Sequence, residues 1–336
     1  MEQQAFVEHS PHQKSSLTTR RIMLDVLIAL APAAVMGCVY FGWQALLVLV
    51  LTVLSAVLTE IIWLLIRKQT FKEIFKQFDL TSVVTGLLLG MCFGSQTAWY
   101  ACILAGAFAV GVAKMLFGGT GRNIVNPALA GRIFAFIAFP TIVAGGWLGA
   151  NFTESAGEVL TGATPLTDFL TNNGVMNTEL WQLFFGYGVP GCIGETCKIA
   201  LLAGYVYLIV RKVIDWKYPL IYIAATGVTT MIIYQSFEVF LPSILSGGLF
   251  LGAIFMATDY VTSPKTLWGN VVYFLVLGII TAVLRFATGI EVVSFCIFLM
   301  NLVTPLIDRF IRPRPFGYVR PKKEKTGKEP AKEAGK

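Results

Sequence analysis

The sequence has 336 residues, of which 56% are hydrophobic and only 13% are charged. Soluble domains carry about 25% charged residues, so most of this chain has no water-facing surface to cover. This composition excludes an ordinary soluble domain, a disordered chain, a collagen and a small disulfide-framed secreted module. The lipid bilayer is therefore the expected solvent, and we expect long apolar spans.

The net charge is +7, from 26 Lys and Arg against 19 Asp and Glu. The basic residues gather at the edges of apolar runs and in the tail after Arg309, which is the pattern of the positive-inside rule. A nucleic-acid-binding protein would need a basic face on a folded domain, so we expect no nucleic-acid partner. The cysteines form no CxxC pair, and His9 and His12 both lie in the polar N-terminus. We therefore expect no metal centre in this chain.

The first apolar run, residues 22–42, is long enough to span a bilayer, and it follows a polar segment without a cleavable signal. The second run, residues 44–66, begins after almost no loop and is followed by basic residues from Arg67 to Lys76. These two runs predict a helical hairpin whose ends face the cytoplasm. Further spans, several of them short enough to be broken or tilted, are predicted at 80–94, 98–116, 124–143, 198–210, 218–234, 246–257, 268–287 and 292–311.

The fold class predicted by these runs is an all-α polytopic membrane protein with about ten transmembrane helices. Residues 133–197 contain carboxylates but no Lys or Arg, so this stretch is expected on the outer side and both termini on the cytoplasmic side. The expected regions are a cytoplasmic N-terminal segment (1–21), a first membrane half (22–143), an outer loop (144–197), a second membrane half (198–311) and a basic cytoplasmic tail (312–336).

The two membrane halves resemble each other in sequence. Gly86–Phe93 reads GLLLGMCF and Gly248–Phe255 reads GLFLGAIF, and each lies in a short span that is followed by a longer one. The next helix carries Asn126–Pro127 in the first half and, more loosely, Asn301 and Pro305 in the second. We therefore predict two structurally repeated halves with short or broken helices, an arrangement that often builds a site near the middle of the membrane.

The outer loop is longer than most connections between helices, which indicates a function of its own. It contains the segment Leu160–Leu166, which reads LTGATPL. On physical grounds this segment is a turn of small residues or a helix start, because Gly162 permits unusual dihedral angles, Pro165 fixes the chain and Thr164 would cap the helix.

The same segment resembles the flavinylation site of the membrane subunits shared by the Rnf complexes and the sodium-pumping NADH:quinone oxidoreductases. The resemblance implies that a flavin transferase attaches FMN through its phosphate to the hydroxyl of Thr164, which would make the chain a flavoprotein. The small neighbours Gly162 and Ala163 would let the bulky ring approach. The family motif usually has Asp six positions before the acceptor, and this chain keeps a carboxylate there as Glu158.

Two further stretches carry the resemblance. Phe117–Arg132 resembles the Gly-rich turn of the family, which leads into an Asn-Pro-Ala-Leu helix, and Phe255–Pro264 resembles its Ala-Thr-Asp segment. Together with Ser10–His12 and Ile22–Val26, the similarity extends over nearly the whole chain. It implies a subunit of an ion-translocating oxidoreductase in the bacterial cytoplasmic membrane.

Within this family, the quinone-reducing branch usually has a longer N-terminal segment, so the chain is expected to be a D-type subunit of an Rnf complex. Such a complex couples ferredoxin oxidation and NAD⁺ reduction to Na⁺ or H⁺ transport. The expected partners are other membrane subunits, an FMN-bearing outer subunit and a cytoplasmic NAD-reactive subunit. The alternatives are the corresponding subunit of the quinone-reducing sodium pump, and a channel or permease of related fold without flavin.

The Gly-rich turn at Phe117–Arg122 lacks the spacing of a nucleotide-binding loop and is expected to be a tight turn between helices. The resemblance also raises the alternative of a non-covalent riboflavin near the cytoplasmic side, between the two halves. Asn123 and Asn126 from the first half, and Thr258 and Asp259 from the second, are the residues that would surround it.

Ionisable side chains in a membrane span usually mark a pathway or a pair, because an isolated charge costs several kcal/mol there. Asp25, Lys114 and Glu291 lie near span ends and are expected to snorkel to the interface. Glu60 and Asp259 are therefore the candidates for an ion pathway.

Overall fold

The computed structural model describes residues 18–143, 164–172, 174–176 and 178–311. Within these ranges every regular element is helical and no strand is present. The predicted all-α fold class is therefore confirmed. The elements are α1 (Thr19–Ile66), α2 (Phe71–Gln77), α3 (Thr81–Met91), α4 (Trp99–Val110), η1 (Gly111–Met115), α5 (Pro127–Ala138), α6 (Pro140–Val143), α7 (Pro165–Thr171), α8 (Leu180–Phe185), α9 (Lys198–Val210), α10 (Lys217–Tyr234), α11 (Phe240–Leu245), α12 (Leu249–Leu251), η2 (Gly252–Met256), α13 (Leu267–Thr288) and α14 (Val293–Phe310).

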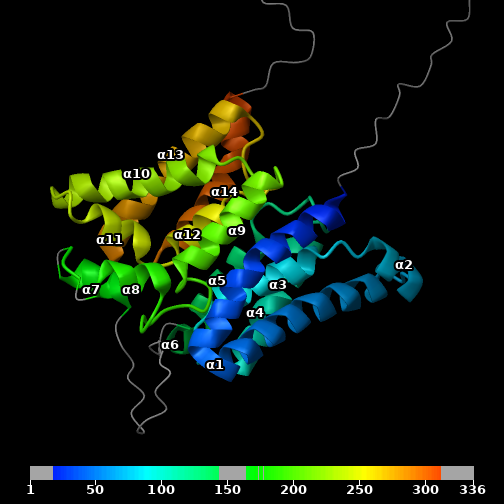
Figure 1. Ribbon diagram of the computed structural model, residues 1–336. Coiled ribbons are helices and arrows are strands. Elements are labelled where there is room, and N and C mark those ends of the chain that lie inside the picture. The colour runs from blue at the N-terminus through cyan, green and yellow to red at the C-terminus, as the bar shows by residue number, and fades with distance from the viewer. Residues whose placement is uncertain (1–17, 144–163, 173, 177, 312–336) are drawn as a thin grey trace, which may run out of the picture.

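The long element α1 consists of two helices rather than one. Gly42 has φ 70° and ψ −155°, a conformation outside the helical region that glycine adopts without a steric penalty. The two legs of α1 diverge from this break (Figure 1). The predicted hairpin of residues 22–42 and 44–66 therefore forms, with its corner at Gly42.

The helices form two groups that pack in the same order. In the first group, the second leg of α1 packs against α3 and α4, and α5 packs against α4. In the second group, α10 packs against α13 and η2, and α14 packs against α13. The groups meet through the contacts of α1 with α9 and of α5 with α14. This order agrees with the predicted repeat, in which α3 corresponds to α12 and η2.

Small residues allow the helices of the first group to approach closely. A Cβ atom at Gly86 would lie 2.6 Å from the Cα atom of Val53, and one at Gly106 would lie 2.9 Å from the Ser55 hydroxyl oxygen. Such contacts between small side chains are typical of helix association in membranes. They hold α3 and α4 against the second leg of α1.

Several described helices are apolar enough for a membrane. Three of them, α1, α13 and α14, pass a length and hydropathy test for a membrane span, and α2 with α3 passes as a pair bent by 68°. Shorter apolar helices are Trp99–Met115, Pro127–Ala138 and Lys198–Val210. The number of about ten spans stays a prediction, as do the region boundaries.

Candidate functional site

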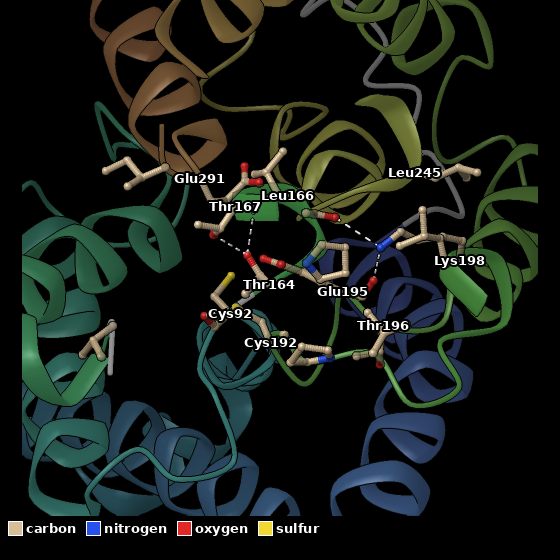
Figure 2. A pocket seen from close by; sticks show the side chains of 18 of the residues that line it. Cys92, Thr164, Leu166, Thr167, Cys192, Glu195, Thr196, Lys198, Leu245 and Glu291 are labelled. Carbon is tan, nitrogen blue, oxygen red and sulfur yellow. Dashed lines mark hydrogen bonds between the residues drawn. The ribbon is translucent and has the colours of Figure 1, made fainter. Parts of the chain in front are cut away.

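A cavity of about 210 Å³ lies beside α7, at the C-terminal end of α3 and the N-terminal end of α9. We call it the Thr164 cavity; Figure 2 shows its lining side chains. Apolar side chains form most of its wall and a few charged groups interrupt them, which is typical of a cofactor site. Its lining includes Cys92, Arg132, Phe136, Thr164, Leu166, Thr167, Cys192, Glu195, Thr196, Lys198, Leu245, Gly247, Glu291 and Phe295.

Thr164 is the N-cap of α7, and Pro165 occupies the first helical position, where proline is favoured. The Thr164 Oγ1 atom accepts a hydrogen bond from the backbone N–H of Thr167 at 3.3 Å and lies 2.8 Å from the Thr167 Oγ1 atom. The predicted helix start is therefore confirmed. Gly162 and Ala163 lie outside the described residues, and their role stays a prediction.

Two ion pairs involve the wall of the Thr164 cavity, which Arg132, Glu195 and Glu291 line and Arg285 does not. The Arg132 Nη1 atom lies 3.5 Å from the Glu195 Oε1 atom, and the Arg285 Nη2 atom donates to both carboxylate oxygens of Glu291 at 3.2 and 3.0 Å. Burial raises the pKa of Glu195, although the charge of Arg132 opposes this. Each carboxylate of the wall is thus matched by one guanidinium.

Lys198 is the second cation that lines the cavity, and no carboxylate pairs with it at ion-pair distance. Lys198 is only 4% exposed. Its ammonium donates hydrogen bonds to two backbone oxygens, that of Glu195 and, at 3.2 Å, that of Gly247. No carboxylate oxygen lies within 4.0 Å of this ammonium in the part of the chain that the structure describes. Lys198 is therefore a buried cation with carbonyl partners only.

The cavity wall also contains polar atoms without partners. The buried hydroxyl of Thr196 has no hydrogen-bond partner among the described residues, and the Oε1 atom of Glu195, although 3.5 Å from Arg132, accepts no hydrogen bond there. Native structures leave few buried polar atoms unsatisfied, so such atoms beside a cavity indicate room for a polar ligand.

A second cavity, of about 110 Å³, lies at the other ends of the same helices, beside Thr81 of α3 and Leu208 of α9. The helices α3 and α9 have 11 and 13 residues, so each helix is about 16–20 Å long at a rise of 1.5 Å per residue, and the two cavities lie at its opposite ends. The second cavity brings together all four residues expected around a second flavin, namely Asn123, Asn126, Thr258 and Asp259. We call it the Asn126 cavity.

Asn126 joins the two halves at this cavity. Its Oδ1 atom accepts from the backbone N–H of Ala128 at 3.0 Å and so caps α5, while its Nδ2 atom donates to the backbone oxygen of Met256 at 3.2 Å. The Asn123 Nδ2 atom donates to the backbone oxygen of Val125 at 3.0 Å. Both asparagines thus already have structural partners, which sequence reasoning did not foresee.

Asp259 lies in the loop after η2. Its Oδ2 atom accepts from the hydroxyl of Thr262 at 3.2 Å, and its Oδ1 atom accepts from the backbone N–H of Val261 at 3.5 Å. Burial raises the pKa of Asp259, and these hydrogen bonds only partly oppose it. The carboxyl therefore holds a proton more readily than an exposed aspartate does.

Glu60 and Lys114 form a buried ion pair next to the Asn126 cavity. The Lys114 Nζ atom lies 2.8 Å from the Glu60 Oε1 atom and also donates to the hydroxyls of Thr81, at 2.5 Å, and Ser82, at 3.0 Å. The Glu60 Oε2 atom is buried without a partner among the described residues. Lys114 belongs to η1, a π-helical turn, and such turns often occur at functional sites.

The expectation that Asp25 and Lys114 snorkel to the interface is wrong, whereas Glu291 is partly exposed and pairs with Arg285. Lys114 is 2% exposed and Asp25 is 4% exposed, and each is paired inside the protein. The partners of Asp25 and Lys114 lie 186 and 54 residues away along the chain, so a local pattern does not reveal them. The pairs are Lys114–Glu60, Arg211–Asp25 and Arg285–Glu291.

Sequence reasoning missed Lys198, Glu195 and Thr196 as cavity residues. One signal could have identified Lys198: it ends the long stretch without Lys or Arg and begins a predicted span at the outer side. A lysine there is an exception to the positive-inside rule. Such an exception indicates that the charge has a local purpose.

The sequence profile of the NQR2, RnfD, RnfE family matches residues 6–317. The D subunit of the Na(+)-translocating ferredoxin:NAD(+) oxidoreductase complex of Acetobacterium woodii is 37% identical over 320 residues, which are 95% of this chain and 97% of that protein. The D subunit of the proton-translocating ferredoxin:NAD(+) oxidoreductase complex of Clostridium ljungdahlii is 36% identical, over 93% of this chain and 96% of its own. The D subunit of the ion-translocating oxidoreductase complex of Stutzerimonas stutzeri is 33% identical, over 88% and 92%. The chain therefore belongs to the NQR2, RnfD, RnfE family.

Proposed function

We propose that this chain is the D subunit of an ion-translocating ferredoxin:NAD⁺ oxidoreductase complex in the bacterial cytoplasmic membrane, and that it carries FMN on Thr164. Two relatives bear the name of such a subunit, and the alignments cover 97% and 96% of them. One observation carries the flavin part of the proposal: Thr164, which stands in the segment that resembles a flavinylation site, lines a buried cavity. A channel or permease would need no such acceptor.

The residues of the Thr164 cavity fit a flavin phosphate ester. Thr164 would hold the phosphate at the mouth of the cavity, and Leu166 and Leu245 would supply apolar walls that exclude water. Thr196 and Lys198 would supply polar contacts for a ring edge. When bound, FMN supplies an electron carrier whose properties the surrounding charges tune.

Covalent attachment is tested by fluorescence of the denatured subunit in a gel, after co-expression with a flavin transferase. The wild-type band should fluoresce, Thr164→Ala should abolish the signal, and Thr167→Ala should keep it. Thr167 is the matched control because its hydroxyl lies only 2.8 Å from that of Thr164. An intact-mass increase that maps to a peptide containing Thr164 would identify the ester. A dark wild-type band would contradict the proposal.

A second, non-covalent flavin, riboflavin, is proposed for the Asn126 cavity. The support is that residues from both halves meet there, as the resemblance predicts. The Thr164→Ala subunit carries no covalent flavin, so any flavin that acid releases from it is bound non-covalently. We expect close to one riboflavin per subunit, and purified protein without released flavin would contradict the second site.

Glu60 and Asp259 are proposed as ion-pathway residues, since both carboxylates lie beside the Asn126 cavity or line it. The names of two relatives state Na(+) for one and protons for the other, so the coupled ion must be measured for this complex. Glu60→Gln and Asp259→Asn complexes that retain their flavin should move fewer ions per electron pair. Unchanged stoichiometry in both variants would exclude this role.

A further inference from the structure

Lys198 is a cation in a position that is unfavourable for a cation. It is the first residue of α9, where the positive end of the helix dipole opposes a positive side chain. Only 4% of Lys198 is exposed, so bulk water contributes little to the solvation of its charge. Carbonyl oxygens compensate a buried ammonium only in part, because a buried charge requires a partner of opposite sign.

Neither of the two carboxylates that line the cavity lies within the 4.0 Å ion-pair distance of the Lys198 ammonium. Glu195 lies 3.5 Å from Arg132, and Glu291 accepts two hydrogen bonds from Arg285. Counted together with Arg285, which pairs with Glu291 but does not line the cavity, this cluster holds three cations and two carboxylates, and Lys198 supplies the surplus positive charge. Figure 2 shows the Lys198 ammonium directed toward the centre of the cavity, and Thr164 lies on the opposite side of the cavity.

We propose that Lys198 is the counter-ion of the reduced flavin ring in the Thr164 cavity and that it raises the reduction potential of that flavin. This inference rests on the proposed function, because it requires FMN on Thr164. Reduction of an isoalloxazine by two electrons, with uptake of one proton at N5, leaves one negative charge on the N1–C2 edge of the ring. A fixed ammonium beside that edge stabilises the reduced form more than the neutral oxidised form.

The test is a dithionite titration of the purified, FMN-loaded complex, followed by flavin absorbance. Lys198→Met keeps an unbranched side chain of similar length but removes the charge, and it should shift the midpoint potential to a more negative value. Lys198→Arg, which restores the charge, should return the potential toward that of the wild type. Lys217→Met is the matched control, since Lys217 is also the first residue of an apolar helix but is exposed. It should leave the potential unchanged.

Thermal unfolding provides a second measurement that does not depend on turnover. Dithionite reduction should raise the Tm of the wild type more than that of Lys198→Met. If Lys198 instead pairs with the phosphate, Lys198→Met will lower the Tm equally in both redox states and leave the potential unchanged. That result would overturn the inference.

The flavin-free Thr164→Ala variant tests the premise directly. There the ammonium has no anionic partner, so adding Lys198→Met should raise the Tm. A lower Tm would show that Lys198 is already satisfied by its carbonyl partners and would also overturn the inference. Failure of the proposed function is recognised separately, as a wild-type band without fluorescence. A fluorescent band with an unchanged potential in Lys198→Met refutes only the role of Lys198.

Discussion

Thr164 caps α7, and the flavin ester proposed for it requires different chemistry. A helix cap needs a side-chain acceptor, whereas an ester linkage needs a hydroxyl. Asparagine caps a helix about as well as threonine, and alanine does not. In the flavin-free subunit, Thr164→Ala should therefore lower the free energy of unfolding by about 1 kcal/mol, while Thr164→Asn should leave it nearly unchanged in thermal unfolding. With the transferase present, both variants should lack FMN. An asparagine variant as unstable as the alanine variant would contradict the capping role.

The Glu60–Lys114 pair is the other residue-scale feature with a measurable consequence. Lys114→Met leaves the Glu60 carboxylate buried without its partner, and breaking a buried pair in this way costs about 3–5 kcal/mol. The double variant Glu60→Gln/Lys114→Met removes both charges, so it should be less destabilised than the sum of the single variants. A double-mutant cycle on thermal unfolding measures this coupling. Additive effects would show that the two charges do not stabilise each other.

At the scale of elements, the contact between α9 and the first leg of α1 depends on a glycine. A Cβ atom at Gly204 would collide with the backbone oxygen of Ala29, and no side-chain rotation relieves a clash with backbone. Gly204→Ala should therefore destabilise the protein by about 1–3 kcal/mol, although alanine favours a helix. Gly111→Ala is the control, since its Cβ atom would lie 3.3 Å from the Thr59 methyl group, a contact that a small shift relieves. Equal thermal stability of the two variants would contradict the close packing.

Helix positions were predictable because the length of an apolar run is a local property. The predicted spans at 198–210, 268–287 and 292–311 agree with α9, α13 and α14 to within one residue at each end. The register of the repeat was not predictable in this way. Asn126 caps the start of α5, whereas Asn301 lies inside α14, so the expected correspondence of the two asparagines is wrong. Apolar segments resemble one another at several offsets, and only packing selects one.

For the candidate sites too, local features were predictable from the sequence and tertiary contacts were not. Thr164 and Asn123 could be proposed from the sequence because short motifs carry the resemblance, and their roles toward a flavin stay predictions. The partners of charged residues were missed because they are distant in sequence: Lys198 bonds to the backbone of Gly247, and Asp25 pairs with Arg211. Such pairs follow from the tertiary structure, so a sequence pattern identifies the charge but not what satisfies it.

At the scale of the whole molecule, the two cavities lie at opposite ends of α3 and α9. Each has a matched ion pair in or beside its wall, and each is bounded by elements from both helix groups. Figure 1 shows α7 and α8 on one side of the molecule and the first turn of α1 and the last turn of α14 on the other. In a bilayer crossed by these helices, the two cavities therefore lie near opposite membrane surfaces.

This arrangement makes the orientation of the chain a sharp prediction. We expect Thr164 on the outer side, because residues 133–197 lack Lys and Arg. In a Cys38→Ala background, whose other cysteines are buried, a membrane-impermeant maleimide should label Thr171→Cys in intact cells and should label Lys265→Cys only after the cells are opened. Both positions are exposed, so accessibility within the protein does not limit the reaction. The reverse labelling pattern would place the Thr164 cavity on the cytoplasmic side and would contradict the expected orientation of the chain.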